Sequence, residues 1–148
     1  MKKLRIFIYS HGLDHMIEIY LKHLFQKKGY EIFLSDIDHL RPFEGSDVQI
    51  TLLTDYCFVS KIELAIFDNL KSYAETKEKN LLIPILWPDI EENVSLPEFF
   101  KRQKSYILRE ARMEYYGFSI SNFHNFSIEI LCLVNSIEKD IKEYYEIG

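Results

Sequence analysis

The sequence predicts an α/β protein with an open, doubly wound, mostly parallel sheet of five strands and helices on both faces. Three observations lead to this prediction. Short apolar runs alternate with longer segments of helical periodicity, which is typical of strand–helix–strand units. The chain has only 5 Gly and 4 Pro, which favours long regular elements. Its 148 residues contain no repeat or linker, so residues 1–148 are expected to form one domain.

The first strand and the first helix have the clearest patterns. Residues 4–9 form a nearly continuous apolar run, as expected of a parallel strand that is buried on both faces. Residues 13–28 repeat apolar side chains at helical spacing. Lys27 and Lys28 suit the negative end of that helix, and Gly29 is a natural residue to end it.

The remaining elements follow in the same alternating way. Further strands are predicted at 30–34, 48–53, 81–86 and 105–108, and further helices at 59–79 and 127–146. One apolar stripe of the last helix is predicted to comprise Ile130, Leu131, Val134, Ile137 and Ile141. The segment 36–47 carries Pro42 and Gly45 and has no helical periodicity. The connection between strands two and three is therefore expected to be shortened and to lack a full helix.

Composition and charge narrow the function classes. The chain has 18 Lys and Arg against 23 Asp and Glu, a net charge of −5, and no basic block, so no nucleic-acid partner is expected. No segment has the length of a membrane helix or the pattern of a signal peptide, so no membrane partner and a cytoplasmic location are expected. Cys57 and Cys132 are too few for a disulfide scaffold, and both are expected to be small core residues in a reducing compartment.

A ligand site is expected at one edge of this sheet. Open α/β sheets bind ligands beyond the carboxyl ends of their strands, where the strand order reverses. The candidate substrate-binding residues at that edge are Tyr9, Ser10, His11, Asp36 and Trp87. A capping role for Ser10 and Asp14 at the first helix is the alternative.

Glu63 is an anomaly in the pattern of its helix. Val59, Ile66 and Leu70 lie at −4, +3 and +7 from it, which puts a carboxylate on or beside the apolar stripe. In one interpretation the side chain reaches solvent or pairs with a basic residue. In the other, it is a positioned carboxylate in the ligand cleft.

Several common catalytic and binding motifs are missing. The chain has neither a phosphate-binding loop nor a dinucleotide-binding glycine fingerprint, and it has no hydrolase elbow of the form GxSxG. His11 and His15 have the spacing of half a metal site, but no cluster supplies further ligands. No metal is therefore expected.

Four segments in order resemble one known family. They are RIFIYSH at 5–11, CFVSKIEL at 57–64, LIPILWPD at 82–89 and LPEFFKRQKSYI at 96–107. Together they resemble the Toll/interleukin-1 receptor (TIR) domain, as a bacterial stand-alone TIR-like protein, over residues 4–145. The resemblance implies a flavodoxin-like fold with strand order 2-1-3-4-5.

The resemblance also implies an activity. Many bacterial and plant TIR domains cleave NAD at the nicotinamide–ribose bond, and their catalytic glutamate matches Glu63. NAD is then the substrate and no separate cofactor is expected. Tyr9 and Trp87 would hold the nicotinamide, and the loop at about 36–46 would cover the site. The ADP-ribose would be hydrolysed, cyclised or transferred, in bacterial antiphage immune signalling with a separate effector or sensor protein and with TIR–TIR self-association.

Departures from the family pattern keep two alternatives open. Cys57, Val59 and Ser60 stand where the family's helix motif usually has serine, tryptophan and cysteine, and the loop after strand two is shortened. These departures favour a non-catalytic interaction module. A nucleoside deoxyribosyltransferase-like enzyme, which also uses a glutamate against an N-glycosidic bond, is ranked lower. The aromatic segment 109–126 matches no expected element and could cover the sheet edge or mediate association.

Overall fold

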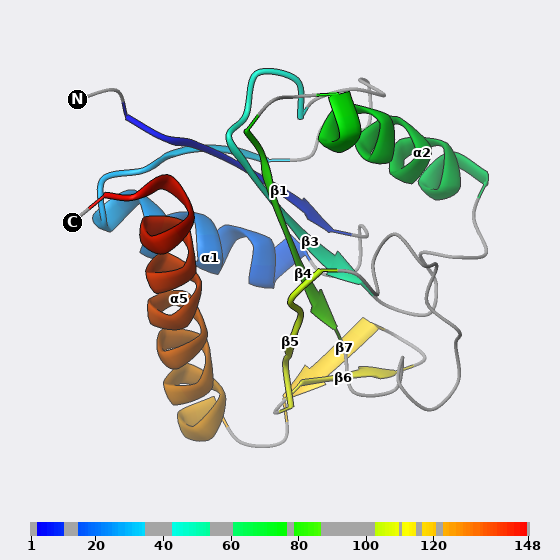
Figure 1. Cartoon of the computed structure of the whole chain (residues 1–148). Helices are drawn as coiled ribbons and strands as arrows, with labels where there is room; N and C mark the ends of the chain where they lie inside the picture. The colour runs from blue at the N-terminus through cyan, green and yellow to red at the C-terminus, as the bar shows by residue number, and fades with distance from the viewer. Residues whose placement is uncertain are drawn as a thin grey trace.

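The centre of the molecule is a parallel five-stranded sheet in the order β2-β1-β3-β4-β5 (Figure 1). The computed structural model describes residues 3–10, 15–34, 43–53, 61–76, 79–86, 103–109, 111–114, 117–120 and 123–147. Within these ranges, the side chains of residues 15–16, 61–63, 76, 111–114 and 117–120 are not described. The strands of the sheet are β1 (Arg5–Ser10), β2 (Glu31–Leu34), β3 (Val48–Leu53), β4 (Leu81–Leu86) and β5 (Tyr106–Ile107).

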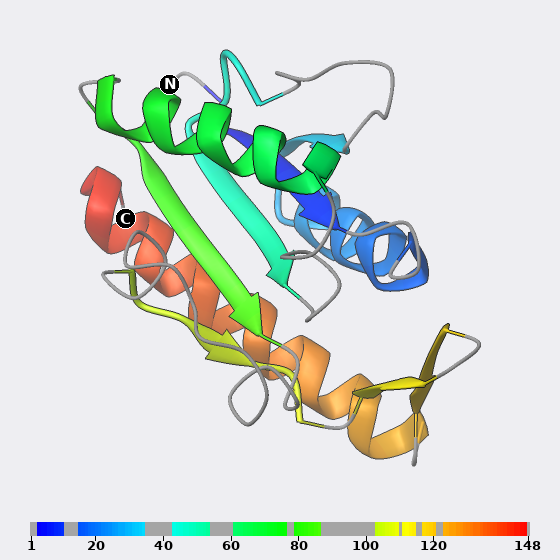
Figure 2. The same cartoon turned by 90° about the vertical axis from the view of Figure 1, so that its right-hand side faces the viewer.

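Helices lie on both faces of the sheet. Figure 2 shows α2 (Lys61–Thr76) on one side, with α1 (His15–Lys27) and α5 (Phe123–Tyr145) on the other. Side chains alternate along each strand, so Ile6 and Ile8 of β1 pack with the α1/α5 face, whereas Phe7 and Tyr9 pack with the α2 face. The predicted fold class and strand order are confirmed.

The core consists of two apolar clusters, one on each face of the sheet. The α1/α5 cluster includes Leu21 and Phe25 of α1 and Ile130 and Ile137 of α5, all fully buried. On the other face, Ile66, Phe67 and Leu70 of α2 pack over β1, β3 and β4. Ile66 and Leu70 are buried as the helical spacing predicts.

The last helix differs from its prediction at its start and on its surface. It begins at Phe123 rather than at 127. Leu131, predicted to be in the apolar stripe, is 47% exposed, and Cys132, predicted to be a core residue, is also exposed. Successive residues are about 100° apart around a helix, so both side chains turn past the edge of the stripe that Ile130 and Ile137 define. Cys57 lies outside the described residues.

A hairpin that no pattern predicted follows β5 in the chain and precedes α5. It consists of β6 (Ala111–Glu114) and β7 (Gly117–Ile120), which pair antiparallel as a separate two-stranded sheet (Figure 1). It accounts for much of the aromatic segment that matched no expected element.

Candidate functional site

The strand order reverses between β1 and β3. The chain leaves β1 toward β2 on one side and leaves β3 toward β4 on the other. Crevices at such points, beyond the carboxyl ends of the strands, are where open α/β sheets bind ligands. In register, Tyr9 lies beside Thr51 and Ser10 lies beside Leu52, so these four residues mark the candidate site.

Tyr9 and Phe67 form an aromatic wall on the α2 side of this edge. The ring of Tyr9 meets the ring of Phe67 edge-on, with centroids 5.6 Å apart and planes at 79°. Tyr9 also stacks on Phe7 at 6.5 Å and is only 4% exposed. Tyr9 therefore lies at the strand end where the sequence predicted it, within an aromatic cluster.

Position 63 lies on the same side of α2 as this wall. It precedes Phe67 by four residues and Leu70 by seven, and residues at these spacings share one side of a helix. Because α2 follows β3, its first turn lies at the carboxyl edge of the sheet. The side chain of Glu63 is outside the described residues, so its catalytic role stays a prediction, as does pairing with a basic residue.

Ser10 and Glu18 form a buried polar pair on the α1 side of the same edge. The Oγ of Ser10 donates a hydrogen bond to a carboxylate oxygen of Glu18, and the two residues are 6% and 2% exposed. The described part of α1 begins at His15, and the Ser10 hydroxyl is bonded to Glu18, so a capping role for Ser10 stays a prediction. Sequence reasoning missed Glu18, although it lies three residues before Leu21 and seven before Phe25, both of which are buried.

Thr51 adds a polar atom on the α2 side. The residue is fully buried in β3, and its Oγ1 has no hydrogen-bond partner among the residues that the structure describes. A buried hydroxyl that lacks a partner costs about 1–3 kcal/mol. Both sides of the sheet at the strand reversal therefore contain a buried polar side chain, and on the α2 side Gln49 of β3 is a second one.

The other predicted site residues have different outcomes. His11, Asp14, Asp36 and Trp87 lie outside the described residues. For the covering loop at 36–46, the expectation is wrong for residues 43–46. These lie at the amino end of β3, where the Tyr73 hydroxyl accepts a hydrogen bond from the amide of Gly45 and donates one to the carbonyl of Ser46. The close packing of Phe43 on Phe7 and Tyr73 holds this segment away from the carboxyl edge.

Among the described residues, no group of three or more His, Cys, Asp and Glu side chains could hold a metal ion. Within the same part of the chain, no helix combines the length and the apolar character needed to cross a membrane.

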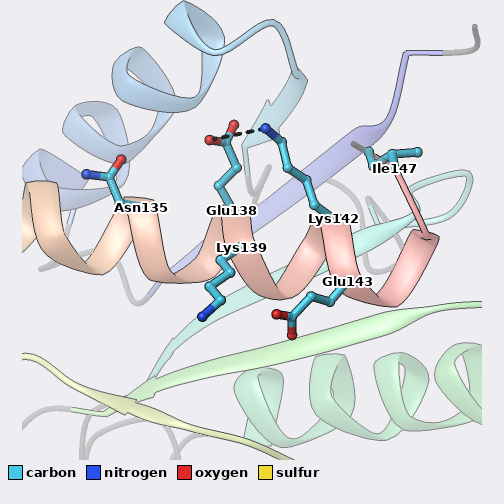
Figure 3. A pocket seen from close by; sticks show the side chains of 6 residues that line it. All are labelled: Asn135, Glu138, Lys139, Lys142, Glu143 and Ile147. Carbon is cyan, nitrogen blue, oxygen red and sulfur yellow. Dashed lines mark ion pairs between the residues drawn. The ribbon is translucent and has the colours of Figure 1, made fainter.

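A surface hollow of about 300 Å³ lies on the second half of α5, far along the helix from its start at the carboxyl edge (Figure 3). Its lining comprises Asn135, Glu138, Lys139, Lys142, Glu143 and Ile147. Figure 3 shows Glu138 and Lys142 directed toward one another, and their charged atoms are 4.0 Å apart. Lys28 of the α1 end approaches the same Glu138 carboxylate at 3.2 Å. The hollow thus has balanced charges and is separate from the candidate site.

Comparisons with known proteins identify the fold class. No protein-family model matches the chain, and no curated protein matches it. Among solved structures, NanR of Vibrio vulnificus, complexed with ManNAc-6P, has a TM-score of 0.60 and 13% identity over 97% of this chain and 52% of NanR. This chain thus spans about half the length of NanR.

Two further structures are similar to the chain. A flavodoxin of Streptococcus pneumoniae TIGR4 has a TM-score of 0.60 and 8% identity, over 93% of this chain and 99% of the flavodoxin. The rubredoxin:oxygen oxidoreductase of Desulfovibrio gigas has a TM-score of 0.59 and 12% identity, over 97% of this chain and 37% of that protein. At these identities the similarity defines the class alone, which is a flavodoxin-like α/β fold.

Proposed function

We propose that this protein is a TIR-type NAD glycohydrolase or ADP-ribosyl cyclase or transferase that cleaves the nicotinamide–ribose bond, with Glu63 as its catalytic carboxylate. One observation carries the proposal. Position 63 precedes Phe67 by one helical turn, on the side of α2 where the Phe67 ring contacts Tyr9 at the strand reversal. A carboxylate at that position would border the crevice where ligands of such sheets bind.

The chemistry requires few groups. Nicotinamide leaves with the electrons of the N-glycosidic bond and becomes neutral, while the ribose carbon gains positive, oxocarbenium-like character. A carboxylate beside that carbon stabilises the developing charge. Water then attacks and releases a proton to give ADP-ribose, or an internal or external acceptor attacks to give a cyclic or transferred product. The buried rings of Tyr9 and Phe67 would exclude water from one side of the nicotinamide.

The biological setting belongs to the same proposal. We place the reaction in bacterial antiphage immune signalling in the cytoplasm, where the product acts on a separate effector protein and a separate sensor triggers the enzyme. NAD is the substrate, and no further cofactor takes part.

The decisive experiment compares two glutamates of one helix. Purified protein, Glu63→Gln and Glu75→Gln are each incubated with NAD, and nicotinamide and ADP-ribose products are measured by chromatography and mass. Glu75 is exposed near the other end of α2, so its variant is the matched control. We expect release by the native protein and by Glu75→Gln, and release reduced at least about 100-fold in Glu63→Gln. Absence of release by the native protein at high concentration with crowding agents would contradict the proposal.

A second candidate, the non-catalytic interaction module, is favoured by a different observation. Ile19 of α1 and Ile128 and Leu131 of α5 are each close to half exposed, although they are large apolar side chains. Exposed apolar side chains on adjacent helices favour association with another protein or with a second copy. Light scattering over a concentration series measures self-association, and a monomer at all concentrations would disfavour the second copy.

A further inference from the structure

The Ser10–Glu18 pair interrupts an apolar face. Along the α1 side of β1, the buried residues are Ile6, Ile8 and then Ser10. Along the core side of α1, Glu18 stands where the following turns have Leu21 and Phe25. The buried residues of β3 on this face, Val48, Ile50 and Leu52, are all apolar. Replacing buried polar pairs with apolar residues is often neutral or stabilising, so stability gives little reason for this pair.

The direction of the hydrogen bond determines which partner Ser10 could take. A serine hydroxyl has one proton and two lone pairs. Its proton is donated to Glu18, so any further partner must itself donate a hydrogen bond to the lone pairs of the Ser10 oxygen. A carboxylate acceptor also increases the negative character of the hydroxyl oxygen. Ser10 thus selects a ligand group that donates, such as a sugar hydroxyl, over a phosphate or carbonyl oxygen.

The position of the pair shows where that donor would lie. Ser10 is the last residue of β1, beside Leu52 at the strand reversal. On the other side of the sheet, next to Tyr9, Thr51 has a buried hydroxyl that finds no partner in the described part of the chain. Thr51 is fully buried two residues before the end of β3, whereas Ser10 is at the very end of β1, so a ligand hydroxyl at the strand ends would meet Ser10.

We infer that Ser10 accepts a hydrogen bond from a hydroxyl of the terminal ribose of an ADP-ribose-containing nucleotide, and that Glu18 is the positioning residue that orients Ser10 for it. The inference rests on the proposed function for the identity of the nucleotide. It adds a specificity determinant on the α1 side of the sheet, opposite to Glu63. Ser10 and Glu18 thereby distinguish a nucleotide with a terminal ribose from one without.

The experiment measures binding without turnover. ADP-ribose and ADP, which lacks the terminal ribose, are titrated calorimetrically into the native protein, Ser10→Ala, Ser10→Thr, Glu18→Gln and the double variant Ser10→Ala/Glu18→Gln. Ser46→Ala is the matched control, because Ser46 is also a buried, hydrogen-bonded serine but lies at the amino end of β3. Circular dichroism establishes that each variant is folded.

We expect the native protein to prefer ADP-ribose over ADP. Ser10→Ala should weaken ADP-ribose binding about fivefold, as expected for one hydrogen bond, and leave ADP binding unchanged. Ser10→Thr, which keeps a hydroxyl at this position, should show the preference for ADP-ribose that Ser10→Ala loses. Glu18→Gln should also reduce it, but should add no further loss in the Ser10→Ala background because the two residues act as one unit. Ser46→Ala should keep the native preference.

The inference is overturned if Ser10→Ala retains the preference for ADP-ribose, or if this variant weakens the binding of both ligands by the same factor. It is also overturned if the native protein binds ADP-ribose no better than ADP. Failure of the proposed function gives a different result. In that case nicotinamide release is absent, while the ribose preference and its loss in Ser10→Ala remain.

Discussion

The two edges of the sheet both bury polar groups, but they use them differently. At the amino edge, the Tyr145 hydroxyl donates to the carbonyl of Asp47 at 2.5 Å, and the Tyr73 hydroxyl bonds to the segment 43–46. These bonds join residues 27 or more positions apart in the chain. At the carboxyl edge, Ser10 bonds to Glu18, eight positions away, and no described residue bonds to the hydroxyl of Thr51.

This difference indicates that hydrogen-bonded polar side chains have a structural role at the amino edge and a ligand-binding role at the carboxyl edge. Bonds between distant segments hold the fold together, so the bonded hydroxyls at the amino edge have a structural explanation. Buried polar atoms without a hydrogen-bond partner among the described residues occur near both edges, on Arg5, Gln49 and Asn80 as well as Thr51, so they do not distinguish the two. A buried pair of near neighbours adds little stability, so the Ser10–Glu18 pair needs a functional explanation. Variants at the amino edge should therefore change stability alone, whereas variants at the carboxyl edge should change ligand binding.

Phe43→Ala should give the largest effect at the amino edge. Phe43 is 1% exposed, and its ring packs on Phe7 at 6.0 Å and on Tyr73 at 5.3 Å. Removing such a ring leaves a cavity and should lower the free energy of unfolding by about 3–5 kcal/mol, measured by urea titration. ADP-ribose affinity per folded molecule should not change. A large loss of affinity in the folded variant would break the comparison.

Thr51→Val should raise the free energy of unfolding, whereas Phe43→Ala lowers it. It replaces an unpartnered buried hydroxyl with a methyl group of similar shape, so the free energy of unfolding should rise by roughly 1 kcal/mol. Ser46→Ala serves as the contrast, because Ser46 donates to the carbonyl of Phe43 and accepts from Gln49, and its loss should lower stability by about 1 kcal/mol. Thermal and urea unfolding check both. Destabilisation by Thr51→Val would mean that its hydroxyl has a structural role after all.

Alkaline pH should weaken the amino edge. Burial, with a contribution from the nearby Glu138 carboxylate, raises the pKa of Tyr30 from 10.0 to about 12, and burial also raises the pKa of Tyr145. The unfolded chain loses these protons near pH 10, whereas the folded protein retains them. Stability is therefore full below pH 10 and falls as the pH rises through about 12. Urea titrations across this range should show a shallower fall in Tyr30→Phe, and an equal fall would exclude Tyr30 as a cause.

Lys28→Met should have the smallest effect. Its ammonium group lies 3.2 Å from the Glu138 carboxylate, but the lysine side chain is partly exposed and the pair is screened by water and salt. The expected loss is below about 1 kcal/mol and should shrink further in high salt. A salt-independent loss of several kcal/mol would show that this ion pair belongs to the buried framework of the edge.

The sequence predicts the sheet well because its strands have simple patterns. The bounds of β3 and β4 agree with the expected 48–53 and 81–86, since each strand is a buried apolar run with clear ends. The hairpin of β6 and β7 could not be predicted in the same way. Each of its strands has four residues, too few for a pattern to emerge from the aromatic segment around them.

The candidate site was predicted in part. Tyr9 and Ser10 could be placed at a strand end from the run that precedes them, and the burial of Ile66 and Leu70 supports the helix face expected for position 63. Glu18 was missed because an acidic residue near the start of a helix usually reflects the helix dipole and solvent exposure. Its burial depends on the strand packed beneath α1, and no local pattern contains that information.

The contact between Tyr145 and Asp47 also bears on when the molecule can fold. It joins residues 98 positions apart, and Ile130, Ile137 and Ile141 of the same helix complete the α1/α5 cluster. During synthesis, β1 to β4 emerge before the helix that covers one of their faces. One apolar face of the nascent sheet therefore stays uncovered until α5 has been synthesised. Contacts between residues so far apart in the chain also slow folding. A ligand crevice at the strand reversal would then become competent only once translation has passed α5.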